Sequence, residues 1–293
     1  MTGRRAVLRA LWGASRPAQL LLIAGVYLLG AKIATANGAD GSLPSLLAGA
    51  AALVPVAASV HYANEYADYG TDALTDRTPF SGGSGALHAA GVGRDLALRA
   101  ATAALALGIG AAGALAIAGL LRPASLALLA VIAVFGWQYS VGPLRLAWRG
   151  WGELDNAALG GLVLPAYGAA VVGGPVGRVA LASVPFFLVV LMNLFATQWP
   201  DREADAAVGK RTLAVRWPRR RLRATYVGLG LLAGASLLVL QPEILPRRVA
   251  LASLLPAPLL VVGAIGYTRR HVPWPTVGAM VLLALAQLAA WCL

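Results

Sequence analysis

The chain has 293 residues, of which 59% are hydrophobic and 12% are charged, and its mean hydropathy is +0.72. A soluble domain carries roughly 25% charged residues, so this composition excludes an ordinary soluble protein and indicates an integral membrane protein. The formal net charge of +12 suits attraction to anionic lipid headgroups. We expect membrane lipids and no nucleic acid among the partners, because no soluble domain is left to read a groove.

About 20 mostly apolar residues cross a bilayer as a helix, and nine stretches of the chain meet that length. Gly, Ala, Leu and Val dominate them without alternation, which favours helices over a β-barrel. We expect one all-α transmembrane domain over residues 1–293, and we interpret the first stretch as a span rather than a cleavable signal peptide. The nine stretches are 17–36, 43–63, 95–120, 124–142, 154–174, 178–198, 222–241, 247–267 and 274–292.

Basic residues are distributed unevenly between the two sides of these nine stretches. If the amino terminus is cytoplasmic, 19 of the 24 Lys and Arg residues lie on the cytoplasmic side. Such a bias sets the orientation of membrane proteins. It predicts a protein of the cell (inner) membrane whose amino terminus is cytoplasmic, and it places Cys292, the single cysteine, on the opposite side.

The first acidic motif, residues 64–72, lies at the end of an apolar stretch. Asn64, Asp68 and Asp72 recur every fourth residue, so on a helix they would share one face, one turn apart. Ionisable residues at membrane depth mark functional sites. We therefore expect this row of oxygen atoms to take part in the chemistry.

The second acidic motif, residues 201–205, repeats the design with Asp201 and Asp205, which continue a row begun by Asn193 and Thr197. Pro200 disfavours helix at the preceding residue and suits the first turn of a new one. We expect a kink or break there, with Asp201 near a helix amino terminus. Together the two motifs hold six of the twelve carboxylates, all on the predicted cytoplasmic side.

Mg²⁺ prefers hard oxygen ligands and completes its shell with water and substrate phosphates. The three His residues and Cys292 offer no zinc-like spacing. We therefore expect Mg²⁺ as the cofactor, with the four Asp residues as catalytic groups. The predicted ligands are Asn64, Asp68, Asp72, Asp201 and Asp205.

Four cations on the same side, Arg77, Arg145, Lys210 and Arg211, suit phosphate oxygens, and we expect them to bind a diphosphate together with Asn64. Magnesium and cations around two phosphates are typical of a site that ionises an allylic diphosphate. An apolar cavity in the bundle would hold the isoprenoid tail. The glycine-rich loop, residues 81–85, is interpreted either as a lid over the phosphates or as a flexible connection.

Over nearly its whole length the chain resembles the UbiA-type intramembrane prenyltransferase superfamily. The resemblance rests on Arg16-Pro17, on N-x-x-x-D-x-x-x-D at 64–72, and on D-x-x-x-D at 201–205 followed by Gly209 to Arg216. It implies an all-α bundle of nine helices around a central cavity open to the cytoplasmic side, with Mg²⁺ at both motifs. It also implies transfer of a polyprenyl group from a polyprenyl diphosphate to an acceptor, commonly a quinone-precursor ring.

Residues 139–146 and 149–154 resemble the menaquinone branch, the 1,4-dihydroxy-2-naphthoate polyprenyltransferases, although Glu65 and residues 78–85 depart from its pattern. That branch implies an aromatic acceptor, and we place Tyr139, Glu153 and Asp155 on the acceptor side. Other acceptors stay open: 4-hydroxybenzoate, homogentisate, a chlorophyllide or a glycerol-phosphate lipid. A transporter is disfavoured, because its charges would be expected near the midplane on broken helices.

Overall fold

The computed structural model describes residues 3–293, and the expected all-α class is confirmed for them. They form helices joined by loops, and their only strand-like pairing is one isolated bridge between Thr78 and Ser81. The longest helices are α2 (Pro17–Ala36), α3 (Leu43–Ala67), α6 (Asp95–Ile117), α7 (Pro123–Ser140), α12 (Val184–Gln198), α15 (Arg219–Val239) and α18 (Trp274–Cys292).

Several long helices have a proline in the first turn, namely α2, α3, α7 and α18. Proline suits this position because the N–H that it lacks would have no partner inside the helix. The shorter helices are α1 (Arg4–Ala14), α4 (Tyr69–Asp72), α5 (Ala86–Ala89), α8 (Leu146–Arg149), α9 (Gly152–Ala158), η1 (Leu159–Val163), α10 (Leu164–Val171), α11 (Val176–Ala182), α13 (Arg202–Ala207), α14 (Leu213–Arg216), α16 (Arg247–Ala252) and α17 (Ala257–Gly266).

Seven helical segments of the described chain are long and apolar enough to cross a membrane, with α1–α2 and α16–α17 each counted as one. The pair α11 and α12, bent by 54°, makes an eighth if it is a single span. The other predicted span, 154–174, is largely helical but divided into α9, the π-helix η1, and α10. The chain is a multi-pass membrane protein, and the count of nine spans stays a prediction.

Glycines allow the helices to approach closely. A Cβ added to Gly30 in α2 would lie 2.0 Å from the backbone oxygen of Pro165 in α10, and one on Gly161 in η1 would lie 2.5 Å from Cα of Phe187 in α12. Small residues at such contacts are typical of membrane helices, which associate by close packing rather than by escape from water. This packing explains how a chain so rich in Gly and Ala forms a tight bundle.

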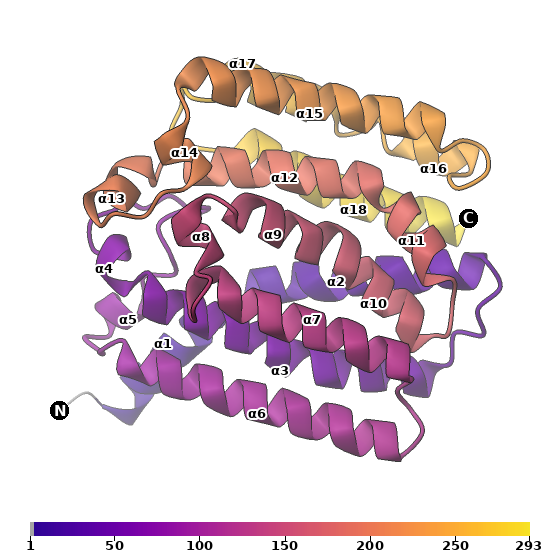
Figure 1. Cartoon of the computed structure of the whole chain (residues 1–293), viewed down its shortest axis with the longest axis horizontal. Coiled ribbons are helices and arrows are strands. Elements are labelled where there is room, and N and C mark those ends of the chain that lie inside the picture. The colour runs from indigo at the N-terminus through magenta and orange to yellow at the C-terminus, as the bar shows by residue number, and fades with distance from the viewer. Residues whose placement is uncertain (1–2) are drawn as a thin grey trace.

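Both acidic motifs lie at one end of the bundle, where α4 contacts α13 (Figure 1). Helix α1 lies at the same end of the bundle as the acidic motifs, whereas α18 finishes at the opposite end (Figure 1), as an odd number of crossings requires. The structure therefore brings together two segments more than a hundred residues apart. That this end faces the cytoplasm stays a prediction from the charge distribution.

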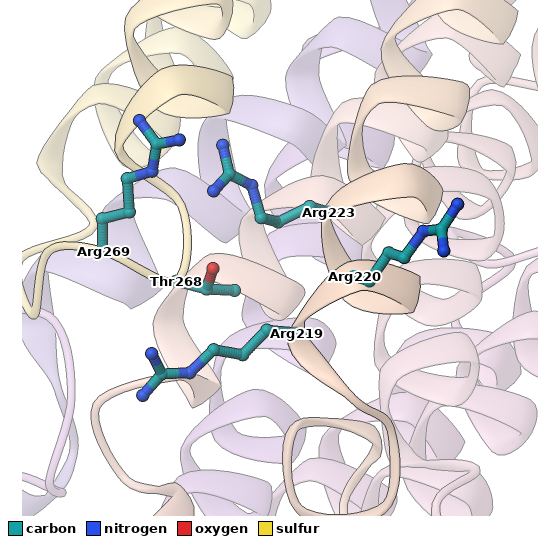
Figure 2. Close-up of a pocket in the computed structure, with 5 residues that line it drawn as sticks. All are labelled: Arg219, Arg220, Arg223, Thr268 and Arg269. Carbon is teal, nitrogen blue, oxygen red and sulfur yellow. The ribbon is translucent and has the colours of Figure 1, made fainter.

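Two cavities of the described part of the chain lie beside α15. The larger, of about 490 Å³, lies at the same end of the bundle as the acidic motifs, between the start of α15 and the loop after α17, and Figure 2 shows its lining. The smaller, of about 80 Å³, lies between α12, α15, α17 and α18. Neither is lined by the acidic motifs, so the central cavity open to the cytoplasm stays a prediction.

Candidate functional site

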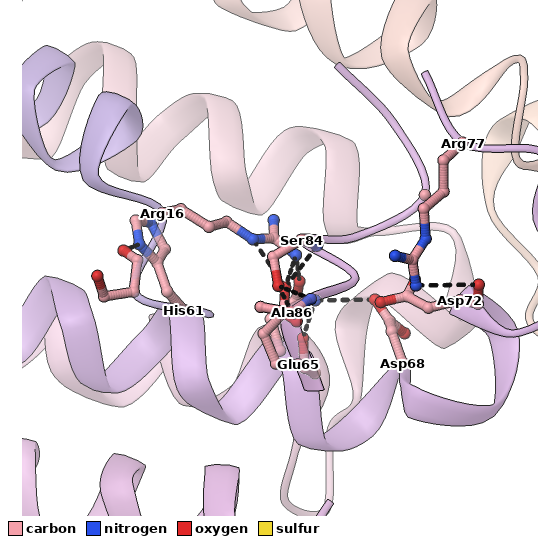
Figure 3. A network of polar contacts seen from close by, with 12 residues as sticks. Arg16, His61, Glu65, Asp68, Asp72, Arg77, Ser84 and Ala86 are labelled. Atoms are coloured by element: carbon pink, nitrogen blue, oxygen red, sulfur yellow. Dashed lines mark hydrogen bonds and ion pairs between the residues drawn. The ribbon is translucent and has the colours of Figure 1, made fainter. Parts of the chain in front are cut away.

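The first acidic motif forms at the end of α3, which stops at Ala67, and continues into α4 after a bend at Asp68. The helical repeat survives the bend, because the N–H of Asp68 donates to the Asn64 carbonyl and the N–H of Asp72 donates to the Asp68 carbonyl, both at 2.8 Å. Asn64, Asp68 and Asp72 thus lie one turn apart, as the spacing predicts. Figure 3 shows the residues around this motif.

Arg16 binds this motif from the junction between α1 and α2, where its backbone is left-handed with φ of 52°. Its guanidinium donates to Oε1 of Glu65 at 3.0 and 2.6 Å and to Oδ1 of Asn64 at 3.0 Å (Figure 3). Glu65 is only 2% exposed, so it needs this cation. The amide oxygen of Asn64, which we predicted to be a metal ligand, is therefore engaged by Arg16.

The second acidic motif confirms the break predicted at Pro200. Helix α12 ends at Gln198, and Asp201 is the N-cap residue of α13. The N–H of Asp205 donates to the Asp201 carbonyl at 2.8 Å, which sets the two carboxylates one turn apart. Oδ1 of Asp201 and Oδ1 of Asp205 are buried and have no hydrogen-bond donor within residues 3–293, and the same holds for Oδ1 of Asn193.

Lys210 joins the two motifs. Its ammonium lies 3.1 Å from Oδ1 of Asp68 and 3.4 Å from Oδ1 of Asp205, and its side chain is 10% exposed. Burial acts to lower the pKa of Lys210, but the carboxylates of Asp68 and Asp205 outweigh it and raise that pKa above its ordinary value. Lys210 is thus a fixed cation between the motifs.

The glycine-rich loop bridges the same two motifs. The N–H of Gly82 donates to Oδ2 of Asp201 at 3.2 Å, while the N–H and hydroxyl of Ser84 donate to the two oxygens of Glu65 at 3.0 and 2.6 Å. Gly83 has φ of 68°, and a Cβ on it would lie 1.8 Å from Oδ2 of Asp72. The loop therefore packs directly onto the carboxylates as a cover, and only glycine fits at position 83.

Burial dominates the ionisation of the acidic motifs. It raises the pKa of Asp72 to about 7, with the neighbouring charges of Asp68 and Glu65 adding to the effect. It raises the pKa of Asp201 to about 6, with Asp205 as the next cause, and it also raises the pKa of Asp205 against the opposing charge of Lys210. Burial, together with the neighbouring carboxylates, therefore makes full ionisation of the site unfavourable unless a further cation is present.

The donor set fits a hard divalent cation. Carboxylate oxygens are what Mg²⁺ selects, and the buried Oδ1 atoms of Asp201 and Asp205 without donors are the kind of atoms that a cation would satisfy. Within residues 3–293, no three His, Cys, Asp or Glu side chains already surround one point. A metal ion at this site would take some ligands from the two motifs and the others from a substrate, because the described part of the protein alone does not surround it.

The other predicted cations lie around this centre without ion pairs to its carboxylates in the described chain. Arg77 lies under the loop: its Nη2 lies 3.5 Å from the Asp72 carbonyl, and a Cβ on Gly85 would overlap its Nη1. Arg145 is exposed, has φ of 43° and stacks over the Trp148 ring at 4.1 Å. Arg211 is exposed, and its N–H donates to the Trp148 carbonyl at 3.1 Å.

The predicted acceptor residues lie near the end of α7, where Tyr139 is, and in α9, which holds Glu153 and Asp155. Glu153 is 1% exposed, and its Oε1 accepts from the N–H of Leu213 at 2.6 Å while its Oε2 has no donor within residues 3–293. A Cβ on Gly152 would lie 3.0 Å from Cε2 of Tyr139, so the Tyr139 ring packs against the start of α9. Oδ2 of Asp155 is also buried without a donor in this part of the chain.

Two connecting residues, Glu65 and Ser84, were not assigned to the site by the sequence. Glu65 was counted among the carboxylates of the first motif and noted as a departure from a family pattern, without a role in the site. Ser84 was part of a loop interpreted either as a lid over the phosphates or as a flexible connection. The available signal was the placement of a carboxylate inside an apolar helix, which requires a buried cation or several donors. Arg16 and Ser84 are those donors.

The fold and site define an all-helical, multi-pass membrane enzyme with two facing acidic motifs. Residues 23–293 match the model of the UbiA prenyltransferase family. The chain belongs to this family, and it is an enzyme that transfers prenyl groups. The resemblance seen in the sequence is thereby confirmed for the family, while the menaquinone branch stays a prediction.

Solved structures share the fold at low sequence identity. A UbiA homolog from Archaeoglobus fulgidus bound to DMAPP and Mg²⁺ is 18% identical with a TM-score of 0.66, over 97% of this chain and 99% of that one. The apo UbiA homolog from Aeropyrum pernix K1 is 18% identical with a TM-score of 0.68, over 94% and 96%. A digeranylgeranylglyceryl phosphate synthase is 15% identical with a TM-score of 0.64, over 98% and 99%. No curated protein sequence matches the chain.

Proposed function

We propose that this chain transfers a polyprenyl group from an allylic prenyl diphosphate to an aromatic acceptor, 1,4-dihydroxy-2-naphthoate, with Mg²⁺ as cofactor. The observation that carries the proposal is the pairing of the two acidic motifs through Lys210, 3.1 Å from Asp68 and 3.4 Å from Asp205. A fixed cation between two carboxylate rows suits a ligand that carries both phosphate groups and metal ions.

Asp68, Asp72, Asp201 and Asp205 are the residues that would hold the metal. Mg²⁺, when bound, neutralises the charge that develops on the departing diphosphate. A homologous fold bound to DMAPP and Mg²⁺ supports this assignment. Asn64 has a supporting role in the proposal, because its amide oxygen accepts from Arg16 and its NH₂ donates to Asp68 at 2.9 Å.

The cations of the chain would bind the diphosphate and stabilise it as it leaves. Lys210 lies between the two motifs. Arg77 contacts the glycine-rich loop and would move together with it. Arg145 and Arg211 flank Trp148 and would swing inward from exposed positions. Preorganised cations lower the barrier because they face the charge as it forms. Opening of the loop would admit the substrate, and its closure would exclude water.

The acceptor is argued from residues 139–154. An electron-rich naphthol carbon attacks an allyl cation without a strong base, which suits a site whose nearby groups are Tyr139, Glu153 and Asp155. The buried Oε2 of Glu153 has no donor within the described chain, so it is positioned to accept a hydrogen bond from an acceptor hydroxyl. Asp155 would orient the ring or take its proton.

The orientation proposed for the enzyme places this site on the cytoplasmic face of the cell (inner) membrane. The charge distribution of the loops supports it, since both motifs lie on the side that collects most of the basic residues. Water-soluble naphthoate would then reach the site from the cytoplasm, while the prenyl chain stays among the helices.

An acceptor screen with radiolabelled prenyl diphosphates of several lengths tests the proposal on the purified protein in detergent with Mg²⁺. We expect label to appear in prenylated 1,4-dihydroxy-2-naphthoate and not in 4-hydroxybenzoate, homogentisate or a chlorophyllide. Labelling of a glycerol-phosphate lipid alone would overturn the acceptor while leaving the metal site in place. Absence of transfer to every acceptor would overturn the assignment of the site.

The order of bond breaking has its own test. Fluorine on the allylic chain destabilises a cation, so a fluorinated prenyl diphosphate should react far more slowly than the natural one, although it binds with similar affinity. An unchanged rate would exclude departure of the diphosphate before attack.

A further inference from the structure

The larger cavity is built almost entirely from arginine. Arg219, Arg220 and Arg223 line it from the first turns of α15, and Arg269 and Thr268 line it from the loop between α17 and α18. In Figure 2 the guanidinium of Arg220 points away from the other four residues. The volume of the cavity is about 490 Å³, and it is an open depression of the surface rather than an enclosed pocket. The cavity therefore has room for a group larger than a single ion.

These arginines lack acidic partners. None of the four forms an ion pair with a carboxylate within residues 3–293. Helix α15 follows Pro218, has no acidic residue in its first turn, and has no side-chain cap. Basic residues at a helix amino terminus oppose the helix dipole, whereas an anion there is favourable. The positive charges of these arginines and of the helix amino terminus therefore favour a bound anion at this place.

Thr268 is an independent sign of a ligand. It is only 5% exposed, has a left-handed backbone with φ of 63°, and its hydroxyl makes no hydrogen bond to residues 3–293. Figure 2 shows the hydroxyl directed toward the space between Arg223 and Arg269. A β-branched residue rarely adopts positive φ, and here that backbone presents the hydroxyl to the cavity. The hydroxyl is therefore available to bind a ligand in the cavity.

We propose that this cavity is a binding site for a phosphate group, carried either by the headgroup of an anionic phospholipid or by free phosphate or diphosphate. Guanidinium groups match phosphate oxygens with paired N–H donors, and a threonine hydroxyl adds one more. The site is separate from the acidic motifs, which repel anions in the absence of metal. The proposal does not depend on which acceptor the enzyme uses.

The test measures binding to the whole purified protein in a neutral detergent, with a chelator present so that the acidic motifs hold no phosphate through metal. Native mass spectrometry would count retained phosphatidylglycerol against phosphatidylcholine, and equilibrium binding would use labelled inorganic phosphate and diphosphate. The variants are R223Q/R269Q and T268V. The matched control is R247Q/R248Q, which removes two exposed arginines from a helix that also follows a proline, Pro246.

We expect R223Q/R269Q to lose at least about tenfold in affinity for the phosphate-bearing probe, because each charge-assisted hydrogen bond contributes that much or more. T268V should lose severalfold, and R247Q/R248Q should bind as the unaltered chain does. Retention of phosphatidylglycerol without competition from inorganic phosphate assigns the site to lipid. Competition by phosphate or diphosphate assigns it to the free anion.

Equal losses in R223Q/R269Q and R247Q/R248Q would mean that only net charge matters, and they would overturn the proposal. Binding of neither lipid nor free phosphate would overturn it as well. Thermal unfolding of each variant separates these results from misfolding, and T268V, which keeps the shape of the side chain, tests the site if the double arginine variant does not fold.

Discussion

The two acidic motifs have the same spacing but different surroundings. In the first, residues 64–72, Asn64 and Lys210 donate to Asp68, and Glu65 accepts from Arg16 and Ser84. In the second, residues 201–205, Gly82 donates to Asp201, and Lys210 forms an ion pair with Asp205 at 3.4 Å. Asp68 and Glu65 in the first motif accept several hydrogen bonds, whereas Oδ1 of Asp201 in the second is buried without a donor in the described chain.

The difference shows that equal sequence patterns do not imply equal roles. A fully partnered carboxylate contributes to stability, because its removal leaves buried cations and donors without partners. A carboxylate with free oxygen atoms contributes little to stability and is ready for a cation or a substrate. The following predictions test how far this division extends, beginning with the largest effect.

Removal of divalent ions should abolish prenyl transfer, and added Mg²⁺ should restore it. Both motifs supply ligands to the metal in our proposal. Chelation should therefore remove the function of both motifs, although their surroundings differ. Product formation with labelled prenyl diphosphate measures the effect before and after chelation. Transfer that persists in a chelator would contradict a metal role for either motif.

Asp68→Ala, Asp72→Ala, Asp201→Ala and Asp205→Ala should each lower the rate at least about a hundredfold, as loss of other charge-stabilising groups does. Glu203→Ala is the matched control, because this carboxylate lies between Asp201 and Asp205 but its side chain is 81% exposed. It should react at nearly the original rate. Nearly full activity of the Asp72→Ala variant would contradict the assignment of the first motif to the metal site.

Asp68→Asn and Asp201→Asn should separate the motifs by stability. Asp68→Asn weakens the contact with Lys210 and should lower the free energy of unfolding by about 1–3 kcal/mol, the range for hydrogen bonds to charged groups. Asp201→Asn keeps an oxygen for the Gly82 N–H and should leave stability unchanged or raised. Unfolding in detergent with a chelator measures both, and equal losses would refute the division between the motifs.

Gly83→Ala should displace the loop that covers both motifs and reduce kcat/KM about tenfold. The added Cβ would collide with Asp72 as well as strain a backbone at φ of 68°. Gly91→Ala is the control, since φ there is +62° and no atom lies within 4 Å of the added Cβ. It carries the backbone cost of roughly 1 kcal/mol without the collision. Similar rates in both variants would deny the loop a role in the site.

Cysteine labelling tests whether the two motifs face the same compartment. Cys292 should react with an impermeant thiol reagent from the extracytoplasmic side. Single cysteines at Thr75 and Ala207, in a chain with Cys292→Ser, should react from the cytoplasmic side. Labelling of all three positions from one side of sealed vesicles would exclude an odd number of crossings.

Much of this protein follows from its sequence through local rules. Hydropathy requires that apolar stretches of about 20 residues become helices in a bilayer, since backbone groups have no water to bind there. The four-residue spacing of Asn64, Asp68 and Asp72 follows from the helical repeat, and Pro200 breaks its helix for a local steric reason. These features depend on neighbours along the chain, so the sequence alone determined them.

The tertiary structure decided which distant groups meet. Nothing local in the sequence pairs Lys210 with Asp68, Ser84 with Glu65, or Arg269 with the start of α15, because each contact joins segments that pack only after the bundle has formed. The two acidic motifs have one pattern, yet Arg16 and the glycine-rich loop engage mainly the first. Their different surroundings come from the three-dimensional packing of the helices, which places more donors beside the carboxylates of the first motif than beside those of the second.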